Sequence, residues 1–264
     1  MKIKLFSTLV LNVLILSFFS ADQARASRNT TGSSSLMVQR GGAIIKFTQR
    51  QISEVNKKLR HTIKARYPQA VGANRDARLA KLNQALRSLA STEVAGFKRD
   101  FTPPEEPMGE MQSYYESEYA ISLVTDEVVS IAFGVSTYGE GAAHPNHHTL
   151  VFNYDLRTGQ TLSLADLFKP NSNYLKIISG YAIKELKKKL SPEPDEDWIE
   201  RGAGASEENY KAWNIARDGL VVTFDPYQVA SYAEGEHVVV VPYSVLKDLI
   251  VPSGALARVT ANKR

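Results

Sequence analysis

The apolar residues of this chain change their spacing across a proline-rich break at Thr102–Pro107. Before the break, between Ala77 and Lys98, apolar residues recur at steps of three to five, which predicts an amphipathic helix. After the break, Tyr119–Leu123 and Val129–Val135 alternate apolar with polar residues, and Thr125–Glu127 suits the turn between them. This alternation predicts two antiparallel strands of a hairpin. Helical and strand segments are therefore separated along the chain, which favours an α+β fold.

The second half of the chain repeats this separation. The predicted elements are a strand at Leu150–Tyr154, a helix at Tyr174–Leu190, strands at Leu220–Phe224 and Val238–Val241, and a short helix with Ser244 as its N-cap. We expect antiparallel sheets with segregated helices, arranged as two intimately associated modules, residues 43–158 and 159–264.

One early segment, Gln51–Tyr67, fits two periods. Ile52, Val55 and Leu59 have helical spacing, whereas residues 59–67 alternate as in a half-buried strand. Ala43–Phe47, just ahead of it, has the composition of a short strand. The residues themselves leave the choice for this segment open.

Charge and cysteine content exclude several classes of function. The 264 residues are 43% apolar and 23% charged, which is ordinary for a folded globular protein. Without the first 26 residues, 29 basic and 27 acidic side chains remain. No cluster of basic and aromatic residues is evident in the sequence, so we expect no nucleic-acid partner. The absence of cysteine excludes disulfides, thiol nucleophiles and thiolate metal sites.

The first 26 residues have the composition of a secretory signal peptide. Two lysines precede an apolar run from Leu5 to Phe19, and Ala24-Arg25-Ala26 has the small-x-small pattern that signal peptidase reads. We expect cleavage before Ser27, a flexible linker at residues 27–42, and a periplasmic or secreted protein without a membrane span. The alternative is an uncleaved anchor, although the run is shorter than the roughly twenty apolar residues that a span needs.

Three histidines lie between two of the predicted strands and suggest a metal site. In this interpretation His144, His147 and His148 bind zinc, with Glu140 or Asp155 as a carboxylate ligand, because imidazole and carboxylate both suit zinc. Against it, the histidines are not spaced on a helix face. In addition, adjacent residues of a strand point to opposite sides, which separates the last two imidazoles.

The preferred interpretation of this stretch is a structural corner. Gly139 and Gly141 permit a tight turn, and His144 forms hydrogen bonds with backbone groups that fix the loop. The sequence has none of the short motifs of hydrolases, so we expect no catalytic residues, no bound metal and no cofactor.

A second conspicuous loop spans Asp225–Glu236. Tyr227 and Val229 are expected to pack on the core, whereas Tyr232 suits either the core or a recognition surface, because tyrosine combines a large apolar face with a polar tip. The acidic segment Asp195–Asp197 is expected to be a solvated loop, since its carboxylates lack an ordered ligand spacing.

Several separated motifs resemble a widespread bacterial family of extracytoplasmic domains of unknown function. The matching residues are Tyr138, Gly141-Ala142-Ala143-His144, Asn153-Tyr154-Asp155, Thr158-Gly159 and Leu164-Ala165-Asp166-Leu167-Phe168. The segments RYPQAVG and FKRDF, and the stretch from Asp218 to Ile250, are also similar to this family. The resemblance covers roughly residues 43–250 and implies a strand at Leu59–Tyr67.

This family forms the outer part of RsiV-type anti-sigma factors, which sense lysozyme, and the non-catalytic region of PdaC-type peptidoglycan deacetylases. The segments that carry sigma regulation or deacetylation are not recognised in this sequence, so the resemblance implies recognition alone. The implied protein is a non-enzymatic binding protein of the cell envelope, with a lysozyme-like hydrolase or peptidoglycan as partner. The alternative is a metal-assisted hydrolase of envelope glycan that uses the three histidines.

The partner-binding residues are predicted from the two conspicuous loops. If Gly139–His148 and Asp225–Glu236 lie on one face of the molecule, four side chains are the candidates for contact with a partner. These are Tyr138, His147, Tyr232 and Glu234.

Overall fold

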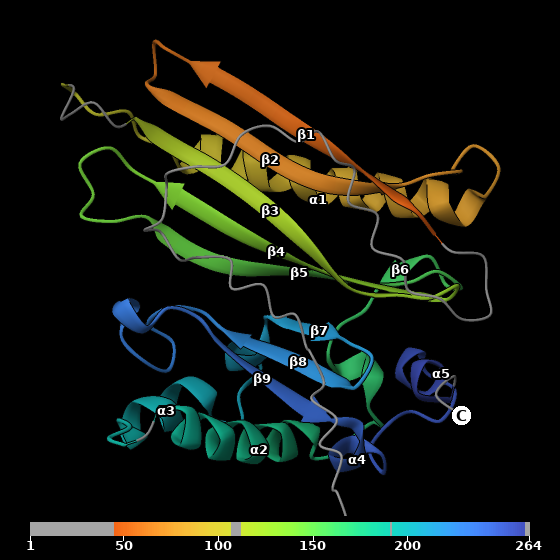
Figure 1. Cartoon of the computed structure of the whole chain (residues 1–264). Coiled ribbons are helices and arrows are strands. Elements are labelled where there is room, and N and C mark those ends of the chain that lie inside the picture. Colours follow the sequence, from red (N-terminus) through yellow and green to blue (C-terminus); the bar gives the residue numbers. More distant parts are fainter. Residues whose placement is uncertain (1–44, 107–111, 191, 262–264) are drawn as a thin grey trace, which may run out of the picture. The chain divides into compact units, whose positions relative to one another are not determined.

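The structure is a computed structural model that describes residues 45–106, 112–190 and 192–261, all of which belong to one compact unit. Two sheets run through it (Figure 1). The six-stranded sheet consists, in spatial order, of β1 (Phe47–Asn56), β2 (His61–Ala70), β3 (Ser113–Val124), β4 (Val128–Tyr138), β5 (Asn146–Asp155) and β6 (Gln160–Thr161). The three-stranded sheet consists of β7 (Trp213–Ile215), β8 (Gly219–Phe224) and β9 (His237–Pro242).

Helices cover the outer faces of both sheets. The longest, α1, packs along the six-stranded sheet, and α2 packs against the three-stranded sheet (Figure 1). The α-helices are α1 (Ala77–Asp100), α2 (Tyr174–Lys189), α3 (Glu196–Ala203), α4 (Tyr243–Leu246) and α5 (Ala255–Ala261). Three short 3₁₀ turns complete the structure: η1 (Ala165–Leu167), η2 (Glu207–Tyr210) and η3 (Tyr232–Glu234).

The predicted α+β class is confirmed, with one strand pair that differs from the expectation. Strands β2 and β3 pair in parallel, with His61 opposite Ser113, whereas every other strand pair in the described residues is antiparallel. Parallel strands need a long crossover connection, and the 24-residue helix α1 supplies it. The boundary between the two predicted modules stays a prediction; the first sheet ends with β6.

The ambiguous segment Gln51–Tyr67 forms two strands, not a helix. β1 and β2 pair along their whole length, with Ile52 opposite Ala65. Buried residues alternate along β2 because one face packs under α1. The helical spacing of Val55 and Leu59 was misleading, since both side chains are exposed in the structure.

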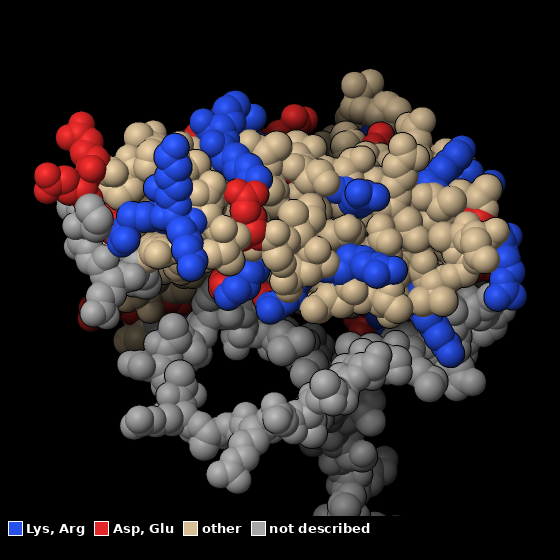
Figure 2. All heavy atoms as spheres, turned by 90° about the horizontal axis from the view of Figure 1, so that it is seen from above, with Lys and Arg blue, Asp and Glu red and all other residues tan. Residues whose placement is uncertain are grey.

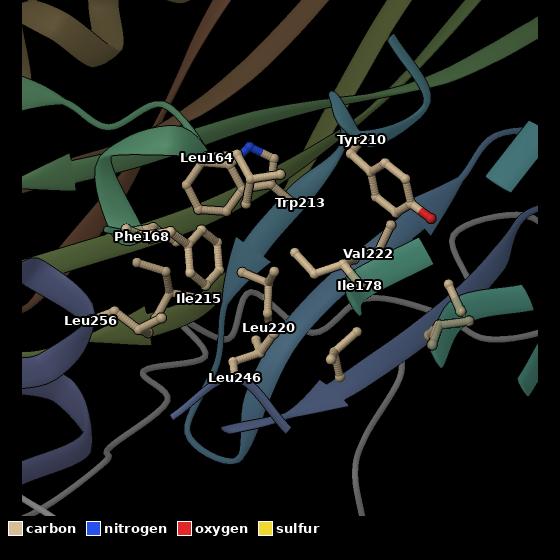
Figure 3. Packing of buried hydrophobic residues seen from close by; sticks show 14 of the residues in the cluster. Leu164, Phe168, Ile178, Tyr210, Trp213, Ile215, Leu220, Val222, Leu246 and Leu256 are labelled. Carbon is tan, nitrogen blue, oxygen red and sulfur yellow. The ribbon is translucent and has the colours of Figure 1, made fainter. Parts of the chain in front are cut away.

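Each sheet has its own hydrophobic core. Leu82 and Leu86 of α1 are fully buried against Ile131 and neighbouring residues of the six-stranded sheet. The second core lies around the three-stranded sheet, where residues from many elements pack together (Figure 3). Its members include Leu164, Phe168, Ile178, Tyr210, Trp213, Ile215, Leu220, Val222, Leu246 and Leu256.

Buried polar side chains join the two sheets. The Ser130 hydroxyl of β4 donates to the Asn153 side-chain oxygen at 2.6 Å, and the Asn153 amide donates to the Trp213 carbonyl oxygen at 2.9 Å. The Ser130 oxygen in turn accepts from the Ile215 amide at 2.9 Å and from the Asn214 side chain at 3.0 Å. Because buried polar groups need partners, this network fixes β7 on the larger sheet.

Two further differences concern where helices begin. Helix α4 begins at Tyr243 with Pro242 at its N-cap, and not after the predicted cap Ser244. Asp195 is the N-cap of helix α3 and accepts from the Trp198 amide at 2.9 Å, so the acidic segment starts a helix and is not simply a solvated loop.

None of the helices in the described ranges combines the length and the apolar character that a membrane span requires. The predicted signal peptide and linker lie outside the described residues.

Candidate functional site: an aromatic cluster between two loops

The two conspicuous loops meet at one end of the structure. The first, Gly139–Pro145, joins β4 to β5, and the second, Asp225–Glu236, joins β8 to β9 (Figure 1). The Tyr232 hydroxyl donates to the Pro145 carbonyl oxygen at 2.9 Å. The Asp225 carboxylate accepts from the Thr149 amide at 2.9 Å. Side chains from strands and loops gather here in what we call the aromatic cluster: Tyr114, Tyr138, His144, His147, Tyr227 and Tyr232.

The first loop contains a tight turn. The Ala142 amide donates to the Gly139 carbonyl oxygen at 2.9 Å, and Gly141 has φ 88°. This left-handed conformation favours glycine, because a side chain there clashes with the backbone. Gly139 does not have a positive φ, so its backbone conformation does not require glycine.

An ion pair anchors this loop to the β1–β2 hairpin. Glu140, which is 1% exposed at its side chain, accepts two hydrogen bonds from the Arg60 guanidinium at 2.8 and 2.9 Å. The Glu140 amide donates to the Ser113 hydroxyl at 2.9 Å. Paired N–H···O bonds of this kind fix both distance and orientation. Glu140, considered in the sequence only as a metal ligand, therefore holds the corner in place.

His144 lies at the centre of the contact between the two loops. Its Nδ1 lies 2.8 Å from the Pro145 carbonyl oxygen, which can only accept, so Nδ1 carries the proton of the neutral ring. Its ring stacks on Tyr232 with centroids 4.0 Å apart, and its Nε2 lies 3.4 Å from the Tyr227 hydroxyl. His144 therefore contacts a backbone carbonyl of its own loop and the rings of the other loop.

The three histidines are not brought together. β5 begins at Asn146, so His147 and His148 point to opposite faces of the sheet. The His147 ring lies 6.0 Å from Tyr232, whereas His148 lines a groove on the α1 side. Within the described ranges, no group of three His, Asp or Glu side chains is placed to hold a metal ion.

The Tyr227 side chain does not pack on the core as expected. It is 54% exposed, and its backbone has φ 71°, which is uncommon for a residue other than glycine. The Trp198 indole donates to the Tyr227 carbonyl oxygen at 2.9 Å, and the Tyr232 ring lies 5.4 Å away. Val229 is buried and takes the core position of this loop.

Tyr138 and Glu234 have supporting positions. Tyr138 is only 8% exposed and stacks on Tyr114, with centroids 5.7 Å apart, so little of its ring is open to a partner. Glu234 is exposed, and its carboxylate accepts from the Ser231 amide and hydroxyl in a capping box of η3. Tyr138 therefore supports the Tyr114 ring, and Glu234 fixes the start of η3, the turn that carries Tyr232.

Burial shifts several pKa values in and beside the aromatic cluster. It lowers the pKa of His147, and the nearby His144 and His148 lower it further. Burial also raises the pKa of Tyr232, and the neighbouring Tyr114 and Tyr227 add to this. Both shifts favour the neutral side chain. At neutral pH the aromatic cluster therefore presents rings with polar tips.

The carboxyl groups of the second loop are also shifted. Burial raises the pKa of Asp225 although the Thr149 amide bonds to it, and burial together with Asp225 raises the pKa of Glu236. These two groups therefore gain protons more readily than exposed carboxyl groups do.

A groove of about 720 Å³ opens on the other side of the corner. The C-terminal half of α1 and the end of β4 form its walls, and the rings of Phe97, Phe101 and Tyr115 contribute to its lining together with His148. Tyr138 of the aromatic cluster also lines this groove, and charged side chains such as Glu93, Arg99 and Asp100 lie among its aromatic rings.

Part of the second half of the chain matches a known protein family. Residues 165–244 match the family described as "Protein of unknown function (DUF3298)". The family resemblance is confirmed. This DUF3298 region contains helices α2 and α3, the three-stranded sheet and the whole second loop.

A curated relative extends the similarity beyond the DUF3298 region. The peptidoglycan-N-acetylmuramic acid deacetylase PdaC of Bacillus subtilis (strain 168) is 30% identical over 170 residues, which are 64% of this chain and 36% of that protein. The chain therefore spans about a third of the length of this relative. The similarity falls on the region outside its catalytic domain.

Two solved structures of DUF3298 family members share the fold. A protein of Bacteroides fragilis matches with a TM-score of 0.55 at 15% identity, covering 82% of this chain and 98% of that one. A protein of Pseudomonas aeruginosa PAO1 matches with a TM-score of 0.56 at 16% identity, covering 78% and 95%. At these identities the likeness concerns the fold alone.

Three residues that form or support the aromatic cluster were not predicted from the sequence: Tyr114, Arg60 and Trp198. Tyr114 and Arg60 precede the DUF3298 region by many residues, and Trp198 lies within it. The tyrosine pair at 114–115 was a visible signal of an aromatic surface. Nothing local to Arg60 or Trp198 indicated their partners, which lie 80 and 29 residues away.

Proposed function

We propose that this chain is a non-enzymatic binding protein of the bacterial cell envelope and that the aromatic cluster is its recognition surface. The observation that carries the proposal is Tyr227, an exposed aromatic side chain held in a left-handed backbone conformation. Such a conformation costs roughly 1–3 kcal/mol and is concentrated at binding and catalytic sites. Stability alone does not favour an exposed tyrosine at this position, whereas contact with a partner would account for it.

The chemistry of the cluster suits a ligand with an apolar face and a hydroxyl rim. Tyr227 and Tyr232 offer ring faces, and His144 and His147 add imidazole rings that accept and donate hydrogen bonds. Sugar rings have this combination of C–H faces and hydroxyl groups. Rings held by Trp198 and by loop contacts lose little freedom on binding, which favours affinity.

Peptidoglycan is the ligand that we propose. Support comes from the curated relative, a peptidoglycan deacetylase that resembles this chain outside its catalytic domain. A recognition region beside such a catalytic domain would hold the enzyme on its polymer. The family resemblance adds a lysozyme-like hydrolase as the alternative partner.

Residues 1–26 support export to the envelope. Mass spectrometry of the exported protein should find Ser27 at its N-terminus.

The contacts of His144 support binding without turnover. The Nδ1 proton of His144 is directed to a backbone carbonyl, and its Nε2 faces the Tyr227 hydroxyl, so neither ring nitrogen contacts a serine or threonine hydroxyl that it could activate. The alternative hydrolase needs three histidines around one metal. In the structure His148 lies on the opposite face of β5 from His147.

Co-sedimentation with insoluble peptidoglycan tests the proposal. We expect the protein to sediment with the polymer, and Tyr227→Ala and Tyr232→Ala each to lower the bound fraction at least several-fold. Tyr181→Ala is the matched control, because Tyr181 lies on α2, packed against the second core and away from the cluster. Thermal melts of each variant show whether the fold is retained.

Two results would reject the proposal. Release of reducing sugar or of free amino groups from peptidoglycan, with or without added zinc, would show turnover. Binding to immobilised lysozyme that depends on Tyr227 and Tyr232, together with no sedimentation on peptidoglycan, would assign the cluster to a protein partner instead.

A further inference from the structure

Charge is distributed unevenly between the first hairpin with α1 and the rest of the structure. Residues 45–106 contain thirteen Lys and Arg against six Asp and Glu. The remaining described ranges, 112–190 and 192–261, contain twelve basic and twenty acidic residues. A basic part and an acidic part therefore share one compact unit, although the net charge of the chain is small.

Several cations of the basic part have partners. Arg60 pairs with Glu140, Lys64 with Glu116 at 3.0 Å, Arg66 with Glu118, and Lys98 with Glu54. Besides Arg75 and Lys81, five other exposed cations of this part have no ion pair with the described residues. They are Lys46, Arg50, Lys57, Lys58 and Arg87, and together with Val55 and Leu59 we call them the β1-edge surface.

These cations lie along one edge of the molecule. β1 is the outermost strand of the six-stranded sheet and carries Arg50, while Lys57 and Lys58 lie in the turn that follows it. Arg87 is eleven residues before Lys98 on α1, which is three helical turns, so both lie on the same flank. Lys98 bonds to Glu54 of β1, so this flank faces the β1 edge.

The view from above looks onto this edge (Figure 2). Lys and Arg side chains are spread over the exposed face and cover more of it than Asp and Glu do. The charge is therefore a property of a surface and not only of the sequence. At physiological salt a surface of this kind attracts anions mainly within about 8 Å.

Two exposed apolar side chains accompany the lysines. Val55, near the end of β1, is 69% exposed, and Leu59, in the β1–β2 turn, is 37% exposed. Along the chain the two residues flank Lys57 and Lys58. The turn is well anchored, because the Leu59 amide donates to the Asn56 side chain at 3.0 Å and the adjacent Arg60 is fixed by Glu140. The tip of the hairpin therefore presents two apolar side chains between cations on a rigid base.

We propose that the β1-edge surface binds the surface of a membrane that contains anionic lipid, with the β1–β2 turn among the headgroups. Basic residues near such a surface each contribute about 1 kcal/mol, which corresponds to about fivefold in partition. Apolar side chains beside them enter the boundary between headgroups and acyl chains. A soluble polyanion would satisfy the cations but would leave Val55 and Leu59 in water.

A second copy of the chain is a poorer occupant of this edge. An unpaired edge strand can pair with another strand, but two copies would place like-charged surfaces against each other.

The membrane proposal does not depend on which ligand the aromatic cluster binds. The Arg60–Glu140 ion pair joins the turn to the corner, so lipid contact would hold the cluster close to the membrane.

Vesicle co-sedimentation of the exported protein tests the proposal. Vesicles of phosphatidylcholine alone are compared with vesicles that also contain phosphatidylglycerol. We expect binding only to the anionic vesicles, and weaker binding as salt is raised. The double variant Lys57→Gln/Lys58→Gln should lower the partition about 25-fold, since each neutralised lysine removes about fivefold. Val55→Ser/Leu59→Ser should lower it several-fold, including at high salt.

The matched control is Val245→Ser/Lys247→Gln, which removes an exposed apolar side chain and a nearby lysine from the acidic part. It should bind as the unchanged protein does. If Lys57→Gln/Lys58→Gln binds anionic vesicles as well as the unchanged protein does, the proposal is wrong. In that case another segment of the chain would account for the binding. Displacement by soluble polyphosphate without any effect of the Val55 and Leu59 substitutions would also overturn it, in favour of a polyanionic polymer.

Discussion

The hydroxyl of Ser130 and the side-chain oxygen of Asn153 lie 2.6 Å apart in the buried seam between the two sheets. Asn153 belongs to the Asn-Tyr-Asp motif on which the family resemblance rests. Its neighbour Asp155 is also buried and bonds to the Arg157 amide at 2.8 Å and to Arg258 at 2.5 Å. This motif is therefore explained by structure: it closes a turn and joins the two sheets.

The seam predicts a large stability effect of a small substitution. Ser130→Ala removes one hydroxyl and leaves the Asn153 oxygen, the Asn214 side-chain amide and the Ile215 amide buried without this partner. Unsatisfied buried groups cost about 1–3 kcal/mol each, so we expect a loss of at least about 3 kcal/mol in the free energy of unfolding, measured by urea denaturation. Ser136→Ala on the same face of β4 is the control, because its hydroxyl lies 3.4 Å from Tyr114 and should cost less than about 1 kcal/mol.

The Glu140–Arg60 ion pair predicts which contact fixes the corner. Glu140→Gln should lower the melting temperature by about 5 °C, because a buried group that accepts two charge-assisted bonds loses its charge. Lys64→Gln breaks an ion pair of two half-exposed side chains and should change it by less than about 2 °C. Equal effects of the two substitutions in a thermal melt would contradict the anchoring role of Glu140.

The left-handed Tyr227 predicts a conflict between stability and binding. Tyr227→Gly relieves a conformation that costs about 1–2 kcal/mol for other residues, so the variant should keep or raise its melting temperature while losing ligand binding. Asn171 also has a positive φ, 59°, but lies outside the cluster. Asn171→Gly should therefore leave peptidoglycan sedimentation unchanged. Binding by Tyr227→Gly equal to that of the unchanged protein would remove Tyr227 from the recognition surface.

The lowered pKa of His147 predicts sensitivity to mild acid. Because burial favours the neutral ring in the folded state, its contribution to stability is complete above the ordinary histidine pKa of about 6.5 and is lost as pH falls below it. The raised pKa values of Asp225 and Glu236 act in the opposite direction, since their protonation stabilises the folded state.

Comparison with a variant isolates the contribution of His147. His147→Gln should lower the dependence of the melting temperature on pH between about pH 7 and 5. Melting curves recorded for both proteins in the same buffers measure this difference. Parallel curves would show that His147 does not titrate with folding, whatever the shape of the common curve.

Local patterns in the sequence determined most of the secondary structure. The leucine spacing before Thr102 produces α1, and the alternation on either side of Thr125–Glu127 produces the β3–β4 hairpin, because each pattern repeats within a few residues of the chain. Gly141 was also predicted as a turn position, and it has a positive φ. The later elements that were predicted occur in the predicted order, whereas α3, β7 and α5 were not predicted.

Only the tertiary structure decided how these elements meet. The parallel pairing of β2 with β3, the ion pair between Arg60 and Glu140, and the stacking of His144 on Tyr232 join residues between about fifty and ninety positions apart. Periodicity carries no information about such partners, because it reports which face of an element is buried and not what covers it. The exposure of Tyr227 was decided in the same way, by a backbone conformation and an indole partner that its neighbours in the sequence do not specify.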